Sequence, residues 1–208
     1  MESRTVELTS RYNGEVKANT IKGHFATKHS HVSHCLDTTR VKSELRMARA
    51  AAKSFAEQFS YTPVDTVLTL ERTKMIGAFL ARDLYNGGIN LHHDIAVVTP
   101  EITDDKMILR DNLIQYLKGK HVLLMTASAT TGMTILAALE GIRYYQGEPV
   151  GVATIFGSCD KIADLPVTRL FGVDDIQGYE SYSKTDCPLC KAGVKVDAVV
   201  NSYGYSKI

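Results

Sequence analysis

The sequence lacks any long apolar run and any large excess of charge of one sign. No stretch approaches the roughly 18 to 20 consecutive apolar residues that a membrane-spanning helix needs. Residues 1–10 alternate charged and small side chains and lack the apolar centre of a signal peptide. The 24 basic side chains nearly balance the 23 acidic ones, so the net field does not favour a polyanion. We therefore expect a cytoplasmic protein that binds neither membrane nor nucleic acid.

Cysteine is scarce, and the two commonest nucleotide-binding motifs are missing. The chain has four cysteines, Cys35, Cys159, Cys187 and Cys190, which we expect to be free thiols in a reducing compartment. No Gly-rich loop carries the Walker A lysine, and no Gly-x-Gly-x-x-Gly occurs. These absences argue against a disulfide framework, a P-loop and a dinucleotide fingerprint.

What is present is an alternation of strand and helix patterns. With 208 residues the chain is long enough for one well-buried domain. Helical spacing of apolar residues occurs over 41–59, 75–84 and 135–142. Continuous apolar runs at 64–70, 95–98, 122–125 and 150–156 predict buried strands. The alternation predicts an α/β fold with a mostly parallel sheet flanked by helices, and a ligand site at the carboxyl ends of its strands.

The segment 122–134 is the most informative, because a buried strand runs through small residues directly into a helix. Thr130, Thr131 and Thr134 supply hydroxyl donors, and Gly132 permits a tight turn. The helix N-terminus adds backbone amides and a positive dipole end, so the segment can hold a phosphate with neutral donors. A Ser/Thr helix cap is the alternative, but four hydroxyl residues in seven positions exceed what a cap requires.

Three motifs together resemble a known family. They are Thr130-Thr-Gly-Met-Thr134, Gly23-His-Phe-Ala-Thr-Lys28 with the serines that follow it, and Asp186-Cys-Pro-Leu-Cys-Lys-Ala-Gly-Val194. In this order and spacing they resemble the type I phosphoribosyltransferases, and most of all the orotate phosphoribosyltransferases. The resemblance implies the type I phosphoribosyltransferase fold, with 1–208 as a single domain and a small N-terminal hood formed by about 1–40 and the C-terminal tail.

The resemblance also implies an activity and its residues. The activity is that of a glycosyltransferase of nucleotide metabolism, transferring ribose 5-phosphate from phosphoribosyl pyrophosphate (PRPP) to a nitrogen base, as in pyrimidine biosynthesis, with release of pyrophosphate. The 5′-phosphate would lie on Ser128, Ala129, Thr130, Thr131, Gly132, Met133 and Thr134. Pyrophosphate would contact Arg72, Thr73, Lys74 and Arg110, and the base would contact Lys28. The family implies Mg²⁺ arriving with PRPP and a homodimer; we assign no general acid or base and predict no protein-bound metal.

Several positions depart from the family pattern. Thr126 and Ala127 stand where the family has two acidic residues beside the ribose, and Asp160, or Asp104 and Asp105, could substitute from another loop. Gly157-Ser158 replaces the Asp-Arg that meets orotate, with Lys161 nearby. The lost carboxylates would weaken stabilisation of an oxocarbenium-like transition state. They favour an alternative, a non-catalytic nucleotide or PRPP-binding regulator on the same fold. The sequence does not identify the base.

Two further features have competing interpretations. Arg110 lies in a segment with acidic and basic residues, which could equally be a solvated surface loop. Cys187-x-x-Cys190 has zinc-ligand or redox spacing, but a second pair is lacking. His29, His31, His34 and Cys35 are the other candidate ligands, and nothing in the sequence brings them together. We interpret the pair as a free dithiol; a metal-dependent redox protein is the third alternative.

Overall fold

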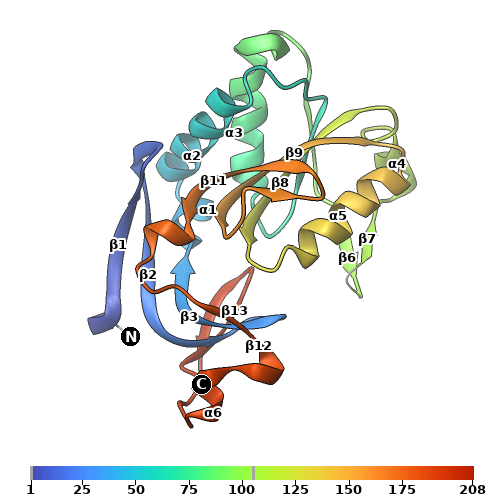
Figure 1. Cartoon of the computed structure of the whole chain (residues 1–208). Helices are drawn as coiled ribbons and strands as arrows, with labels where there is room; N and C mark the ends of the chain where they lie inside the picture. The colour runs from blue at the N-terminus through green and yellow to red at the C-terminus, as the bar shows by residue number, and fades with distance from the viewer. Residues whose placement is uncertain (1, 105) are drawn as a thin grey trace.

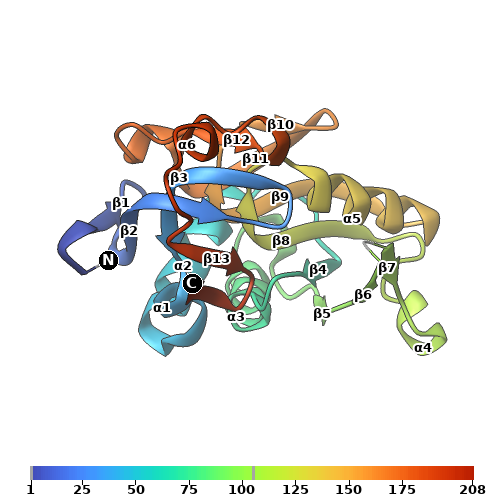
Figure 2. The ribbon, with the colours of Figure 1, turned by 90° about the horizontal axis from the view of Figure 1, so that it is seen from below.

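The computed structural model describes residues 2–104 and 106–208, and their strands form two six-stranded sheets and one small hairpin (Figures 1 and 2). One sheet is mostly parallel and lies at the centre of the chain. The other, at one end of the molecule, is built from both chain termini. In the described residues, no helix has the length and apolar character to cross a membrane.

The central sheet has the strand order β10-β11-β9-β8-β4-β5. Its parallel strands are β4 (Thr66–Thr69), β5 (Ala96–Val98), β8 (His121–Ala129), β9 (Glu148–Gly157) and β11 (Leu165–Gly172). The short strand β10 (Lys161–Ile162) pairs antiparallel with β11 at one edge. All parallel strands therefore present their carboxyl ends at one edge of the sheet, as the sequence predicts.

Helices cover both faces of this sheet (Figure 1). Leu123 and Met125 of β8 pack in a cluster with α2 (Leu45–Gln58) and α3 (Lys74–Tyr85). Val122 and Leu124 point to the opposite face, in a cluster with α5 (Met133–Tyr144). This alternation explains why β8 reads as a continuous apolar run. The predicted parallel sheet with flanking helices is confirmed.

Two predicted segments differ in detail. The helix expected over 41–59 is two helices, α1 (Thr39–Ser43) and α2, because Glu44 between them has extended backbone angles. The polar segment before β8 contains a hairpin of β6 (Glu101–Thr103) and β7 (Lys106–Ile108), followed by the short helix α4 (Asp111–Ile114). Met107 of β7 is buried in the α5 cluster, which anchors this hairpin to the core.

The second sheet, which we call the hood, joins the two ends of the chain. Its order is β12-β3-β2-β13-β14, with β1 paired to β2. The strands are β1 (Thr5–Ser10), β2 (Asn13–Ala26), β3 (Ser30–Asp37), β12 (Ser181–Ser183), β13 (Ala198–Asn201) and β14 (Gly204–Lys207). The helix α6 (Pro188–Lys191) lies between β12 and β13 in the chain. These strands span the predicted hood segments. That the whole chain forms a single domain stays a prediction.

Candidate functional site

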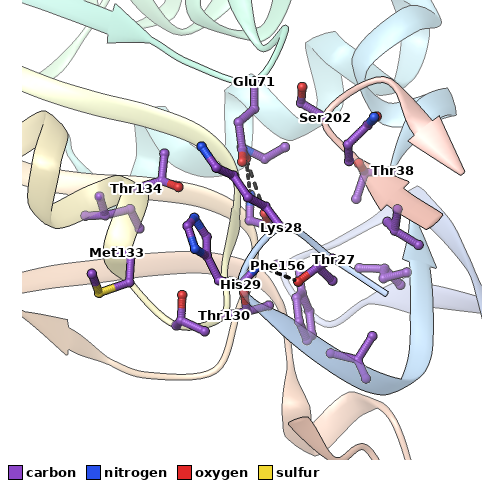
Figure 3. Close-up of a pocket in the computed structure, with 18 of the residues that line it drawn as sticks. Thr27, Lys28, His29, Thr38, Glu71, Thr130, Met133, Thr134, Phe156 and Ser202 are labelled. Carbon is purple, nitrogen blue, oxygen red and sulfur yellow. Dashed lines mark hydrogen bonds between the residues drawn. The ribbon is translucent and has the colours of Figure 1, made fainter. Parts of the chain in front are cut away.

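A cavity of about 380 Å³ lies between the hood and the carboxyl edge of the central sheet (Figure 3). Four segments contribute most of its wall: the β2–β3 turn, the turn after β4, the end of β8 with the loop to α5, and the end of β13 with Ser202. Their cavity-lining residues are Thr27, Lys28, His29, Leu70, Glu71, Ala127, Ser128, Thr130, Thr131, Gly132, Met133, Thr134, Val200, Asn201 and Ser202. The site is thus made where both sheets meet.

The β8–α5 loop is open to this cavity. All of the residues predicted to bind the 5′-phosphate line it except Ala129, which is buried. Gly132 precedes α5 with φ +74°, a left-handed conformation that glycine adopts without steric cost. The Ser158 hydroxyl donates to the carbonyls of Ala129 and Thr130, at 3.1 and 2.7 Å, and so fixes the loop against β9. The loop presents amides and hydroxyls to a space that an oxyanion can enter.

A carboxylate stands beside the two positions where the acidic pair is missing. Oε2 of Glu71 accepts hydrogen bonds from Thr126 Oγ1 at 2.9 Å and from the amides of Ala127 and Ser128 at 3.0 and 2.9 Å. The Ser128 hydroxyl lies 3.3 Å from the same oxygen. Glu71 therefore brings a negative charge to Thr126 and Ala127, although it comes from the turn after β4.

Neither carboxylate source expected from the sequence lies here. Asp160 pairs with Arg169 at 2.8 Å, and Asp104 is exposed at the β6–β7 turn. Neither residue lines the cavity, and Asp105 lies outside the described residues. In the part of the chain that the structure describes, the hydrogen bonds of Glu71 go to the end of β8 rather than to Arg72 or Lys74.

The position of Glu71 follows from the sheet register. β4 and β8 are parallel neighbours, with Thr69 opposite Met125. Residues just after either strand therefore meet at the same edge. Glu71 and Arg72 have φ of +49° and +65°, conformations that cost non-glycine residues about 1–3 kcal/mol each unless the surroundings impose them. Such strain concentrates at functional sites, and the sequence gives no direct signal for it.

The Thr73 hydroxyl holds this turn in place. It is buried and donates to the carbonyls of Leu70 and Met125 at 2.7 and 3.1 Å. The guanidinium of Arg72 lies 4.8 Å over the ring of Tyr203, and Lys74 is exposed at the start of α3. Arg110 forms a two-pronged pair with Glu101 at 2.8 Å. None of Arg72, Thr73, Lys74 and Arg110 is among the cavity-lining residues, and their contact with pyrophosphate stays a prediction.

Two lysines reach the cavity from the hood side. Lys28 and His29 extend into it from the β2–β3 turn (Figure 3). Lys42 of α1 was not predicted; its ammonium donates to the Ser202 carbonyl at 2.9 Å. Burial lowers the pKa of Lys42, the charge of Glu71 acts in the opposite direction, and that of Arg72 lowers it further. Because Lys42 lies in an amphipathic helix with other basic residues, the sequence alone could not single it out.

A second group of side chains, of types that bind metals, lies at the β2–β3 hairpin. His24, His31, Cys187 and Cys190 each offer one ligand atom, and these atoms all lie within 4.8 Å of one another. Nothing in the sequence indicates that the CxxC pair meets histidines, but the fold brings Cys187 and Cys190 together with His24 and His31. His24 was not among the candidates, and β2–β3 pairing places it near His31. His29 faces the cavity instead, and His34 bonds Ser33 at 2.9 Å.

Known proteins resemble this chain in sequence and in fold. No family model matches the chain. The orotate phosphoribosyltransferase of Sulfurimonas denitrificans is 29% identical over 189 residues, covering 83% of this chain and 88% of that protein. The orotate phosphoribosyltransferase of Caldanaerobacter subterraneus is 28% identical over 180 residues, covering 83% and 86%. The resemblance inferred from the motifs is confirmed by these relatives.

Solved structures support the fold. The Mycobacterium tuberculosis orotate phosphoribosyltransferase in complex with 5-phospho-α-D-ribosyl 1-diphosphate aligns with TM-score 0.52 and 17% identity, covering 68% of this chain and 82% of that one. A phosphoribosyltransferase from Corynebacterium diphtheriae aligns with TM-score 0.51 and 23% identity, covering 76% and 90%. The chain therefore has the type I phosphoribosyltransferase fold, as predicted.

Proposed function

We propose that this chain is a glycosyltransferase that transfers ribose 5-phosphate from PRPP to a nitrogen base, orotate-like, with release of pyrophosphate. The observation that carries the proposal is the pairing of an open phosphate loop with a carboxylate beside it, in one cavity. The curated relatives named orotate phosphoribosyltransferase support the same reaction class. We propose that the protein acts in the cytoplasm.

In this proposal the β8–α5 loop anchors the substrate by its 5′-phosphate. Amides and hydroxyls of Thr130, Thr131 and Thr134 are neutral donors at a helix N-terminus, which suits a phosphate dianion. Anchoring the phosphate fixes the sugar relative to the rest of the site, and such positioning lowers the entropic part of the barrier. The loop itself carries out no proton transfer.

Glu71 supplies the charge that Thr126 and Ala127 do not. As the bond between the sugar and pyrophosphate breaks, positive charge develops on the ribose ring. A fixed carboxylate stabilises that charge more than it stabilises the neutral ground state, and so it accelerates the reaction. The three donors from Thr126, Ala127 and Ser128 hold the carboxylate in place beforehand, so little reorganisation is needed. This arrangement is our reason for proposing an enzyme rather than the regulator.

Mg²⁺ arriving with PRPP fits the donor set of the cavity. Mg²⁺ prefers hard oxygen ligands and is commonly held by one or two carboxylates together with substrate phosphates. Glu71 is the one carboxylate among the lining residues that the structure describes, and it is the residue that would hold the ion. The bound ion would neutralise charge on the pyrophosphate leaving group.

The base would lie on the hood side, near Lys28 and the end of β13. A lysine here is compatible with an anionic base such as orotate, although it provides a point charge rather than a two-pronged pair. Pyrophosphate would lie near Glu71 and Lys42, with Arg72, Lys74 and Arg110 as further proposed contacts. We also propose a homodimer, as the resemblance implies; sedimentation of the purified chain tests it.

The test is an assay of pyrophosphate release from PRPP with Mg²⁺ across a panel of pyrimidine and purine bases, with PRPP binding measured in parallel. We expect release that depends on one base, with an anionic pyrimidine the most effective. PRPP binding without release for any base would overturn the enzyme and support the regulator. Absence of PRPP binding altogether would overturn both.

A further inference from the structure

We propose that His24, His31, Cys187 and Cys190 bind one Zn²⁺ ion that ties the C-terminal tail to the hood. Two ligands come from the β2–β3 hairpin, near the N-terminal end of the sequence. The other two come from the segment around α6, near the C-terminal end. Two thiolates and two imidazoles are a donor set that zinc takes in structural sites. No step of the proposed transferase reaction uses this site.

The distances between the donor atoms fit a tetrahedral ion. Zinc bonds of about 2.0–2.3 Å to nitrogen and sulfur separate neighbouring ligand atoms by roughly 3.3–3.8 Å in a tetrahedron. Nε2 of His24 lies 3.6 Å from the Cys187 sulfur and 3.7 Å from the Cys190 sulfur. Nδ1 of His31 lies 3.3 Å from the Cys190 sulfur and 2.9 Å from His24 Nε2. Of these four separations, only the last has to open, by a few tenths of an ångström; the other two between the donor atoms lie within 4.8 Å.

The surroundings of His24 prepare it as a ligand. Its Nδ1 lies 2.9 Å from the Val194 carbonyl, which can only accept, so Nδ1 carries the proton and Nε2 keeps its lone pair toward the sulfurs. Metal-binding histidines commonly have such a second bond, which fixes the ring and its tautomer. The imidazoles of His24 and His31 meet edge-on at 64°, with centroids 4.9 Å apart. The rings thus converge on a point rather than stack.

Burial indicates a structural rather than a catalytic ion. His24 and Cys187 are 1% and 2% exposed, and only Cys190 of the four is exposed. With four protein ligands no coordination position is left for water or substrate, which is typical of structural zinc. The buried apolar cluster of the hood is small, with Ile21, Phe25, Val32, Cys35 and Ala198. An ion at this place would stabilise a sheet whose own core is limited.

The ion would act on the cavity through the segments it joins. The hairpin between His24 and His31 carries Thr27, Lys28 and His29 into the cavity, and the tail after Cys190 leads into β13 and Asn201. A hydrogen-bonded histidine pair beside two thiols is the competing explanation of the same contacts. This explanation requires no metal and predicts that the C-terminal tail stays attached to the hood in metal-free protein.

The test is metal analysis of the full chain purified without added metal, followed by replacement with Co²⁺. We expect about one zinc per chain, and a Co²⁺ spectrum with thiolate-to-metal charge transfer and tetrahedral ligand-field bands. C187S and H31A are expected to lose at least tenfold in Zn²⁺ affinity. H31C should retain the ion, because zinc also accepts three cysteines and one histidine. C159S and H92N, which change a cysteine and a histidine outside the cluster, should bind zinc as the wild type does.

Removing zinc with a chelator should lower Tm and increase hydrogen exchange in residues 181–207, while the central sheet keeps its protection. Wild-type protein that contains no zinc and does not take up Zn²⁺ or Co²⁺ would overturn the proposal. So would a Cys187–Cys190 disulfide in the fresh protein, or Co²⁺ bands that are unchanged in C187S. If C187S does not fold, the Co²⁺ spectra of the wild type and H31C still decide the question.

Discussion

The central sheet and the hood differ in how their contacts arise. In the central sheet, β8 lies between β4 and β9, is covered on both faces, and belongs to two large buried clusters. The hood joins strands from the two ends of the chain around a much smaller cluster. Polar contacts also hold the hood together: Asp197 forms an ion pair with Arg4 at 2.7 Å and accepts a hydrogen bond from the His24 amide at 3.0 Å. In the proposed function the central sheet anchors a phosphate, and the hood completes the cavity.

The largest expected effect separates the two regions by stability. Phe25 is fully buried in the hood, and Phe25→Ala should cost about 3–5 kcal/mol at that site. Because Phe25 packs in the hood's own cluster, we expect hydrogen exchange to rise most at the end of β2, in β3 and in 198–207, and to change little in β8. Leu124→Ala, in the central sheet, is the matched control and should raise exchange throughout. Equal loss of protection everywhere in Phe25→Ala would mean that the two sheets unfold as one unit.

The next effect concerns chemistry at the edge of the central sheet. Glu71→Gln keeps the shape of the side chain but removes its charge, and we expect kcat/KM for pyrophosphate release to fall about 100-fold, or about 2.7 kcal/mol. Thermal stability should change little. Glu140→Gln, on the exposed side of α5, is the control and should retain full activity. Unchanged kcat/KM in Glu71→Gln would remove this carboxylate from the mechanism.

A smaller effect is expected for Gly132→Val in the phosphate loop. A Cβ at this residue would lie 3.3 Å from Ile162 Cδ1, and the φ of +74° is strained for a side chain. The side chain therefore points at Ile162 rather than at the anion, and the loop has to move. We expect PRPP affinity to fall about 30-fold, from roughly 2 kcal/mol of strain. Gly119→Val, with φ +67° and open space around its Cβ, carries the backbone strain alone and should leave PRPP binding intact.

The smallest effect is a pH dependence at the opposite edge of the central sheet. Burial alone would raise the pKa of Asp65, but hydrogen bonds from the His121 amide and ring and from His93 outweigh it and lower the pKa. The stabilisation is present above the ordinary carboxyl pKa of about 3.9 and disappears as pH falls through the lowered folded value. The free energy of unfolding, measured with denaturant, should therefore fall below about pH 4 in the wild type. This fall should be on the order of 1 kcal/mol larger than in Asp65→Asn. Parallel pH curves for the two proteins would contradict this.

The parts of the site that the sequence predicts are those built by neighbouring residues. The β8–α5 loop is continuous in the chain, so Thr130 to Thr134 and the turn at Gly132 can be recognised from spacing alone. Glu71 could have been found in part, because an acidic residue just after one parallel strand meets the end of its neighbour. That inference needs the knowledge that β4 and β8 are adjacent, which periodicity does not supply.

The hood depends on pairing that the sequence does not reveal. His24 and His31 lie near Cys187 and Cys190 only because β2 and β3 pair and the tail returns to β2. His24 lies within the Gly23–Lys28 motif, and no spacing in the sequence marks its side chain as a ligand. Lys42 reaches the cavity only through the placement of α1 beside Ser202. Long-range pairing therefore accounts for most of what was missed.

The most direct measurement is a crystal structure of the chain with Mg²⁺ and PRPP. The account predicts the 5′-phosphate on the amides and hydroxyls of Thr130 to Thr134, with a ribose hydroxyl within hydrogen-bond distance of the Glu71 carboxylate. A phosphate bound elsewhere, or a ribose turned away from Glu71, would contradict it.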